Sequence, residues 1–227
     1  MKPSRFFVGQ TQTPVLIVDD IGESVANILS VATALGPFPP ATNNCPGVRR
    51  ILSPDDRSAW RYLTALLECA SPYLAGAFNL DRFDLVEASF SMVSMQPAQL
   101  KPAQRIPHFD SVEADFFAII HYVSACAGTA FYRHVRTSVE TVNFHNVDHL
   151  VSQLRKDAEF SSEQYFSDSD GRFEKIGMVD GIPGRLVAYP GRLLHSGIIP
   201  VDQELSVIPS KGRLTTNIFI RGHFSET

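Results

Sequence analysis

Residues 212–221 of this chain read GRLTTNIFIR, and their alternation decides the fold that we expect. Neighbouring side chains of an extended strand point to opposite faces, so Arg213, Thr215 and Asn217 share one face. The opposite face is mostly apolar and carries Leu214, Thr216, Ile218 and Ile220. A polar face of this kind suits a cavity, whereas the apolar face needs a covering layer of helices. The stretch therefore predicts a barrel-like sheet with a polar interior.

Strand patterns dominate the chain from residue 85 onward. β-branched and aromatic residues recur there between turn signals. The expected strands are 85–95, 106–111, 116–124, 128–136, 173–179, 185–189, 193–199 and 212–221. Between them, 145–156 has the spacing of a helix, and the acidic, serine-rich stretch 157–172 reads as a solvated loop. Short strands in this number favour a sandwich or jelly roll.

The first 84 residues follow a different pattern. Only 15–18 reads as a strand, whereas 21–35 and 53–72 carry apolar residues at helical spacing. The proline- and asparagine-rich stretch 37–47 reads as a loop. We therefore expect a mainly β fold with flanking helices, in which an α-rich N-terminal part, 1–84, accompanies a β core at 85–222. The length of 227 residues suits a single domain, 1–227.

Composition narrows the classes of function. Hydrophobic residues make up 44% of the chain, which is ample for a packed core, and the formal net charge is −4. No basic run exceeds the pair Arg49-Arg50, which argues against nucleic-acid binding. The three cysteines are far apart and odd in number, so a disulfide framework is not expected. With no long apolar segment either, neither membrane insertion nor a leader is expected, and the cytoplasm is the expected location.

Three residues form a candidate metal site in chain order: His108, Asp110 and His195. His108 and Asp110 lie two apart on an expected strand, so both side chains point to one face. Two histidines and one carboxylate are the ligand set of a facial iron site, which leaves metal positions free for a cosubstrate and oxygen. The alternative is a surface pair on an edge strand.

Arginines supply the candidate anion sites. Arg213 and Thr215 lie two apart on one strand face, where a guanidinium and a hydroxyl can hold one carboxylate together. Asn217 shares that face and is a further candidate. Arg49 and Arg50 could meet an anionic group of a substrate, and the alternative is a plain turn between helices.

The motifs around these residues resemble the prolyl 4-hydroxylase-like members of the iron(II)/2-oxoglutarate-dependent oxygenase superfamily. The matching stretches are 106–110 (IPHFD), 119–124 (IIHYVS), 128–131 (GTAF), 184–190 (GRLVAYP) leading to His195, and 212–217 (GRLTTN). They correspond to the metal strand, the next hairpin, the strand pair that delivers the second histidine, and the cosubstrate strand. The resemblance covers about residues 85–222.

What the resemblance implies is specific. The fold would be a double-stranded β-helix of the jelly-roll or cupin type, with Fe(II) held by the triad and 2-oxoglutarate held by Arg213 and Thr215. Oxygen would be the second cosubstrate, and an amino acid, peptide or small metabolite would be hydroxylated. One departure concerns the strand before His108, where members often carry a tyrosine that bonds 2-oxoglutarate. Residues 89–95 contain none, and Tyr122 on the following strand is the candidate substitute.

Other interpretations use overlapping residues. A cupin-like metal-dependent isomerase or a non-redox binding protein would need the triad but not Arg213. A partner-binding protein with a vestigial site would need no metal. His145 and His149 lie four apart on an expected helix, a spacing that can hold a second metal, and the favoured alternative is a pair of surface or capping histidines. The polar connection 96–105 is expected to act as a mobile lid, and neither the substrate nor the oligomeric state can be read from the residues.

Overall fold

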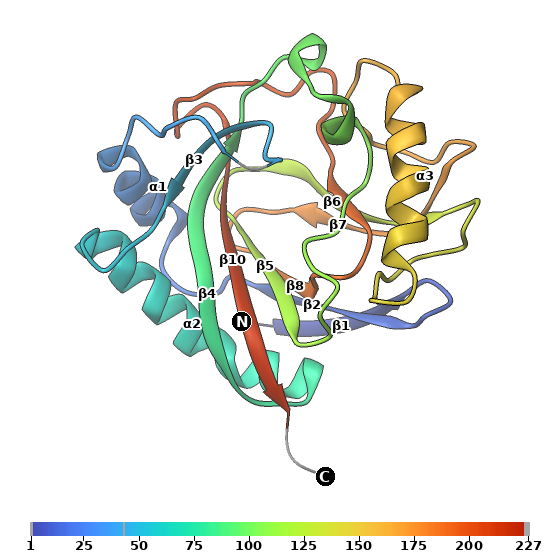
Figure 1. Ribbon diagram of the computed structural model, residues 1–227. Helices are drawn as coiled ribbons and strands as arrows, with labels where there is room; N and C mark the ends of the chain where they lie inside the picture. Colours follow the sequence, from blue (N-terminus) through green and yellow to red (C-terminus); the bar gives the residue numbers. More distant parts are fainter. Residues whose placement is uncertain (1, 43, 225–227) are drawn as a thin grey trace.

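The fold consists of two antiparallel sheets with helices on their outer faces (Figure 1). The structure, a computed structural model, describes residues 2–42 and 44–224. Its strands are β1 (Lys2–Val8), β2 (Thr13–Asp19), β3 (Gly47–Ile51), β4 (Leu80–Val93), β5 (Phe116–Tyr122), β6 (Cys126–His134), β7 (Phe173–Gly181), β8 (Leu186–Pro190), β9 (His195–Gly197) and β10 (Arg213–Phe224). Its helices are α1 (Val25–Ala34), α2 (Arg57–Phe78) and α3 (Val147–Glu159), with short 3-10 helices η1 (Pro97–Gln99) and η2 (Pro102–Arg105). The predicted mainly β fold with flanking helices is confirmed.

The larger sheet has the strand order β1-β2-β8-β5-β10-β4-β3, and the smaller sheet has the order β7-β6-β9. Strand β10 lies between β5 and β4, so its two faces are the inner and outer faces of the larger sheet. Leu63, Leu66 and Leu74 of α2 are buried in one cluster with Ile218 and Ile220 of β10. Helix packing thus covers the face that alternation predicted to be apolar.

One polar side chain interrupts that apolar face, and it is fully bonded. Thr216 lies beneath α2, where its hydroxyl hydrogen-bonds the Tyr62 hydroxyl at 2.8 Å. The same Tyr62 oxygen lies 2.7 Å from Nδ1 of His121, and all three residues are buried. Buried polar groups that find partners fix one arrangement of the elements that carry them. These hydrogen bonds therefore fix the position of α2 behind β5 and β10.

Helix α3 covers the smaller sheet. Leu150 and Leu154 are buried against Tyr132 of β6 and Phe173 of β7 (Figure 1). On the inner side, a third cluster joins the two sheets, with Tyr122 and Val187 from the larger sheet and Phe131 from the smaller one. This packing closes one end of the space between the sheets and leaves the other end for a cavity.

The N-terminal part is mixed rather than α-rich, which corrects the sequence prediction. It contains α1 and α2, but β1, β2 and β3 extend the larger sheet on both sides. β1 and β3 are the edge strands of that sheet. Edge strands tolerate charged residues and proline, so Pro3, Arg5 and Arg49-Arg50 leave little of the apolar alternation that marks a strand.

The strand expected at 106–111 is also shorter than predicted. It is reduced to one antiparallel bridge, between His108 and His195. Pro107 has no N–H to donate, so a ladder cannot continue on its N-terminal side. Even so, this bridge is enough to place His108 beside β9.

Glu140 ties the β1–β2 hairpin to the rest of the fold. Its carboxylate is 2% exposed and accepts hydrogen bonds from the backbone N–H groups of Gln10 and Thr11 at 3.0 and 2.9 Å. The Thr11 hydroxyl and Arg133 complete its partners. Because Gly9 adopts a φ of +66° and a Cβ there would collide with the carboxylate, the turn needs glycine at this position.

Glu140→Ala is expected to lower the free energy of unfolding by about 2–4 kcal/mol, because buried N–H donors and Arg133 lose their acceptor. Urea unfolding followed by circular dichroism measures this change. Glu174→Gln is the matched control: it removes the other, half-exposed partner of Arg133 and should cost less than about 0.5 kcal/mol. Equal losses in the two variants would contradict the role given to Glu140.

Stability should also respond to pH through the same carboxylate. Burial alone would raise the pKa of Glu140, but the hydrogen bonds from Thr11 and Gln10 and the charge of Arg133 outweigh it and lower this pKa. A lowered pKa in the folded state stabilises the protein above the unfolded value, and this contribution is lost as pH falls through the folded value. Urea unfolding at acid pH should therefore show a smaller difference between the parent protein and Glu140→Ala.

Within the described residues, none of the helices has the length and apolar character of a membrane-spanning segment.

Candidate metal and carboxylate site

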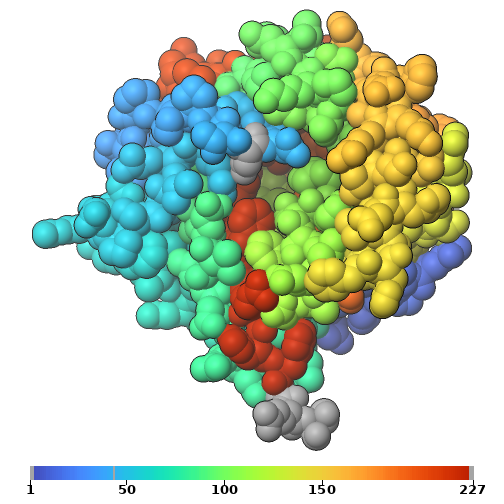
Figure 2. Space-filling model, in the orientation of Figure 1, coloured from blue at the N-terminus to red at the C-terminus, as the bar shows by residue number. Residues whose placement is uncertain are grey.

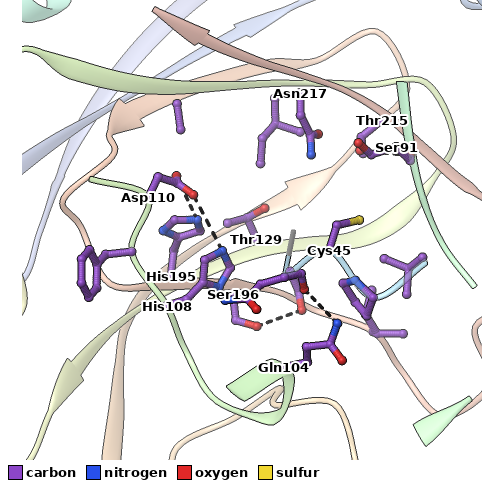
Figure 3. Close-up of a pocket in the computed structure, with 18 of the residues that line it drawn as sticks. Cys45, Ser91, Gln104, His108, Asp110, Thr129, His195, Ser196, Thr215 and Asn217 are labelled. Atoms are coloured by element: carbon purple, nitrogen blue, oxygen red, sulfur yellow. Dashed lines mark hydrogen bonds and ion pairs between the residues drawn. The ribbon is translucent and has the colours of Figure 1, made fainter. Parts of the chain in front are cut away.

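The three predicted ligands meet at one point between the sheets (Figure 3). One donor atom from each of His108, Asp110 and His195 can be chosen so that all lie within 4.8 Å of one another. The Asp110 carboxylate lies 3.9 Å from Nε2 of His108 and 3.5 Å from Nε2 of His195. Among the described residues, these three form the one cluster of side chains suited to hold a metal ion.

Backbone hydrogen bonds set this geometry. His108 and His195 exchange N–H···O bonds of 2.9 and 2.8 Å, so they form a directly opposed antiparallel pair whose side chains lie on the same side. The Asp110 N–H donates to the Gly191 carbonyl at 2.7 Å. The chain thus presents one ligand from the first residue of β9, His195, and two from the segment paired with it.

The protonation states of His108 and His195 leave a ring-nitrogen lone pair of each residue available to a metal ion. Nδ1 of His195 lies 2.8 Å from the Leu193 carbonyl, so Nδ1 carries the proton and Nε2 has the free pair. Burial lowers the pKa of His195 to about 4. Desolvation by the surrounding protein and the nearby His195 also lower the pKa of His108, whose side chain is 45% exposed. Both imidazoles are therefore neutral at neutral pH.

The donor set fits a divalent cation. Burial raises the pKa of Asp110 to about 6, which shows how unfavourable an uncompensated charge is at this point. Its Oδ2 atom is buried and has no hydrogen-bond partner within the described residues. A cation bound between the three side chains would satisfy this oxygen and both Nε2 lone pairs.

Arg213 lies deeper in the same cavity. Its side chain is buried, no ion pair holds it within the described residues, and its Nε has no hydrogen-bond partner. One Nη atom makes a long contact, 3.4 Å, with the Gly128 carbonyl. Thr215 and Ser91 line the cavity beside it. A buried guanidinium without a carboxylate is costly, so this end of the cavity is suited to an anion.

The cavity joins the two ends and opens on one face of the molecule. Its volume is about 360 Å³. Figure 2 shows the surface hollowed between β10, α3, the segment near residue 45 and the segment near residue 100. The predicted lid, 96–105, forms η1 and η2 over this mouth, where Nε2 of Gln104 donates to the Asn44 carbonyl at 3.1 Å. Its mobility stays a prediction.

The two predicted substrate arginines, Arg49 and Arg50, lie on opposite faces of β3. Arg49 lines the cavity, whereas Arg50 points to the opposite face of β3 and pairs with Asp56 at 2.7 Å before α2. Arg50 is therefore not placed to reach a substrate in the cavity, which corrects that prediction. The alternative prediction, a plain turn between helices, is also wrong, because Arg49 and Arg50 both belong to β3.

The remaining predicted cosubstrate residues lie on the inner face. Asn217 lines the cavity, with its side chain pointing into it (Figure 3). Tyr122 is paired in register with Thr215 and is fully buried, and its hydroxyl lies 2.7 Å from that of Thr129, which lines the cavity. Direct contact of Tyr122 with a cosubstrate stays a prediction.

Two tyrosines in the cavity wall were not predicted from the sequence. Tyr189 of β8 packs edge-on against His195 with a centroid separation of 4.9 Å. Tyr165 comes from the stretch predicted to be a solvated loop and donates its hydroxyl to the Met95 carbonyl at 2.7 Å. The pair Tyr165-Phe166, two aromatics within an acidic stretch, was the signal that this loop packs against the protein.

The second candidate metal pair is not assembled into a site. His145 and His149 are both exposed, and neither joins a third ligand among the described residues. His145 precedes α3, which begins at Val147, so the two residues do not share a helix as predicted.

Comparison with known proteins identifies a family. The model of DUF6445, described as a family of unknown function, matches residues 1–220. No curated protein matches the sequence.

Solved structures share the fold across nearly the whole chain. HygX from Streptomyces hygroscopicus with nickel and 2-oxoglutarate bound aligns with a TM-score of 0.55 at 11% identity, over 93% of this chain and 84% of that one. The non-heme α-ketoglutarate-dependent epimerase SnoN from nogalamycin biosynthesis gives 0.54 at 13%, over 92% and 77%. These two matches show that the chain shares the fold of HygX and SnoN.

Proposed function

The chain belongs to DUF6445, a family of unknown function, and we propose that it is an iron(II)- and 2-oxoglutarate-dependent oxygenase. The observation that carries the proposal is the buried, unpaired Arg213 in the same cavity as the triad of His108, Asp110 and His195. A metal centre alone would not require a buried cation at a distance from it. A metal centre that binds a dicarboxylate would, because one end of the ligand reaches the metal and the other needs a guanidinium.

Each residue has a defined task in this proposal. The triad would hold Fe(II), and Arg213 with Thr215 would hold the far carboxylate of 2-oxoglutarate. When bound, the metal with 2-oxoglutarate and oxygen would supply the oxidising chemistry, with succinate and carbon dioxide as coproducts. The neutral imidazoles would keep the ligand set in its binding form, and Tyr189 in the cavity wall packs against His195 and supports its position.

The finer proposal is hydroxylation of an amino-acid, peptide or small-metabolite substrate. The cavity volume of about 360 Å³ and the polar side chains in its wall, among them Arg49 and Asn217, support a small polar substrate. The cupin-like isomerase or binding protein is disfavoured because it gives no role to the buried Arg213.

Succinate release tests the proposal. The protein is loaded anaerobically with Fe(II) and 2-oxoglutarate and then exposed to oxygen, and succinate is quantified by mass spectrometry. We expect succinate only when iron, 2-oxoglutarate and oxygen are all present, at a slow rate that a substrate increases. Failure to bind 2-oxoglutarate in the presence of Fe(II) or Mn(II), measured by calorimetry, would refute the proposed function.

A further inference from the structure

Arg49 is a charged cavity residue that the proposed function leaves without a task. Its side chain is 10% exposed, and it approaches the cavity from β3, at the edge of the larger sheet. The guanidinium donates from Nε to the Ser89 hydroxyl at 2.8 Å and from Nη2 to Glu87. Within the described residues, Nη1 makes no hydrogen bond, so part of this buried cation is available to a ligand.

Register places Arg49 level with Thr215, two residues along the strands from Arg213. Arg213 is paired with Val93, whereas Arg49 and Thr215 are both paired with Ser91. The Arg49 side chain turns further from Arg213, because its partner is Ser89. The two arginines therefore serve separate parts of the cavity, and one dicarboxylate held between the triad and Arg213 does not use Arg49.

An unpaired acceptor lies across from Ser89, the hydrogen-bond partner of this cation. Asn217 is the register partner of Ser89, one strand spacing of about 4.8 Å from it. The Oδ1 atom of Asn217 is buried without a hydrogen-bond partner within the described residues, and the side chain points into the cavity (Figure 3). A buried carbonyl oxygen without a donor is unfavourable, so a ligand N–H or O–H suits this position.

The charge of the cavity selects the sign of the ligand. Its charged lining residues are Arg49, Arg213 and Asp110. Fe(II) and doubly charged 2-oxoglutarate offset each other, and Asp110 offsets one arginine, so one positive charge remains. Glu87 pairs with Arg49, but its side chain is 33% exposed and does not line the cavity, so water screens its charge more.

Closure of the mouth limits the size of the ligand. The hydrogen bond from Gln104 to the Asn44 carbonyl joins η2 to the segment before β3. The Tyr165 hydroxyl joins the loop after α3 to the Met95 carbonyl. Three separate segments thus narrow the opening of a cavity of about 360 Å³, which disfavours a long peptide.

We infer that Arg49 and Asn217 form a substrate subsite for a small carboxylate that carries a neighbouring N–H or O–H donor, as a free amino acid or hydroxy acid does. Arg49 holds the carboxylate and the Asn217 carbonyl accepts from the donor. The inference rests on the proposed function, since it assumes that 2-oxoglutarate occupies the Arg213 end. It narrows the substrate class to molecules that lose affinity when the carboxylate becomes an amide.

The test measures binding by calorimetry to protein saturated with Mn(II) and 2-oxoglutarate. The probes are the common free L-amino acids and their 2-hydroxy acid counterparts, each compared with its carboxamide. We expect at least one acid to bind more tightly than its amide, and Arg49→Gln to weaken that acid by about 10- to 100-fold while leaving the amide unchanged. Asn217→Leu should weaken both, because it removes the acceptor.

Arg50→Gln is the matched control. It removes the same charge from the neighbouring position, but Arg50 points away from the cavity, so acid binding should not change. The inference is overturned if no acid binds, if amides bind as tightly as acids, or if Arg50→Gln weakens acids as much as Arg49→Gln does. Mn(II) and 2-oxoglutarate binding by the parent are measured first: their absence refutes the proposed function, whereas their presence without acid binding refutes the subsite alone.

Discussion

Replacing His195 by alanine is expected to abolish stoichiometric iron binding and to lower 2-oxoglutarate turnover by more than about 100-fold. His195 supplies one of three donors, and its Nε2 is directed at Asp110 by the hydrogen bond of Nδ1 to the Leu193 carbonyl. Two remaining ligands cannot hold the metal in the facial arrangement that leaves adjacent positions open. Metal content after anaerobic loading and succinate formation are the two measurements.

Two further variants make this result interpretable. Because His195 is buried, alanine leaves a cavity, so Asp110→Asn, which is nearly isosteric, should give the same loss without a packing defect. His149→Ala removes an exposed histidine on α3 and should change neither measurement. If His195→Ala and Asp110→Asn bound iron and formed succinate as the parent does, the triad would not be the metal site.

Arg213→Ala is expected to raise the dissociation constant for 2-oxoglutarate by roughly 30- to 1,000-fold, corresponding to about 2–4 kcal/mol. The reason is the loss of a buried guanidinium that no protein carboxylate neutralises within the described residues. Iron binding should persist, because Arg213 is not part of the triad. Calorimetry with Mn(II)-loaded protein measures the change, and Arg213→Lys should recover part of it, since the charge returns without the planar fork.

A cosubstrate analogue separates recognition from a general packing defect. 2-Oxobutanoate has the keto acid end of 2-oxoglutarate but lacks the far carboxylate. The parent should prefer 2-oxoglutarate strongly, and Arg213→Ala should lose most of that preference. A variant that kept the full preference would show that another residue holds the far carboxylate.

The inner face of β10 was predictable from the sequence because alternation has a period of two. Once Arg213 and Thr215 share a face, the strands paired with β10 only have to supply the rest of a cavity wall, and β4 does so through Ser91 and Val93. Alternation also predicted that His108 and Asp110 point to one side, but the meeting of this pair with His195 was predicted from the order of the three residues in the chain. The sequence did not predict how short the strand around His108 is, because a single bridge to His195 is enough to position His108.

The cavity mouth was less predictable, for a different reason. Its walls come from segments far apart in the chain, and no local period connects Asn44, Gln104 and Tyr165. The same applies to the choice between Arg49 and Arg50, which needed the register of β3 on β4. The edge strands β1 and β3 were missed because charges and proline hide their alternation.

The paired backbones of His108 and His195 bear on how metal and folding are coupled. Both residues, and Asp110 through Gly191, are held by main-chain hydrogen bonds that belong to the folded chain itself. Zinc-finger domains are the opposite case, since their ligands come together only when the ion binds. Here the conformational entropy of gathering the ligands is lost when the chain folds. Chelation should therefore give a folded, metal-free protein that takes the ion up again without refolding.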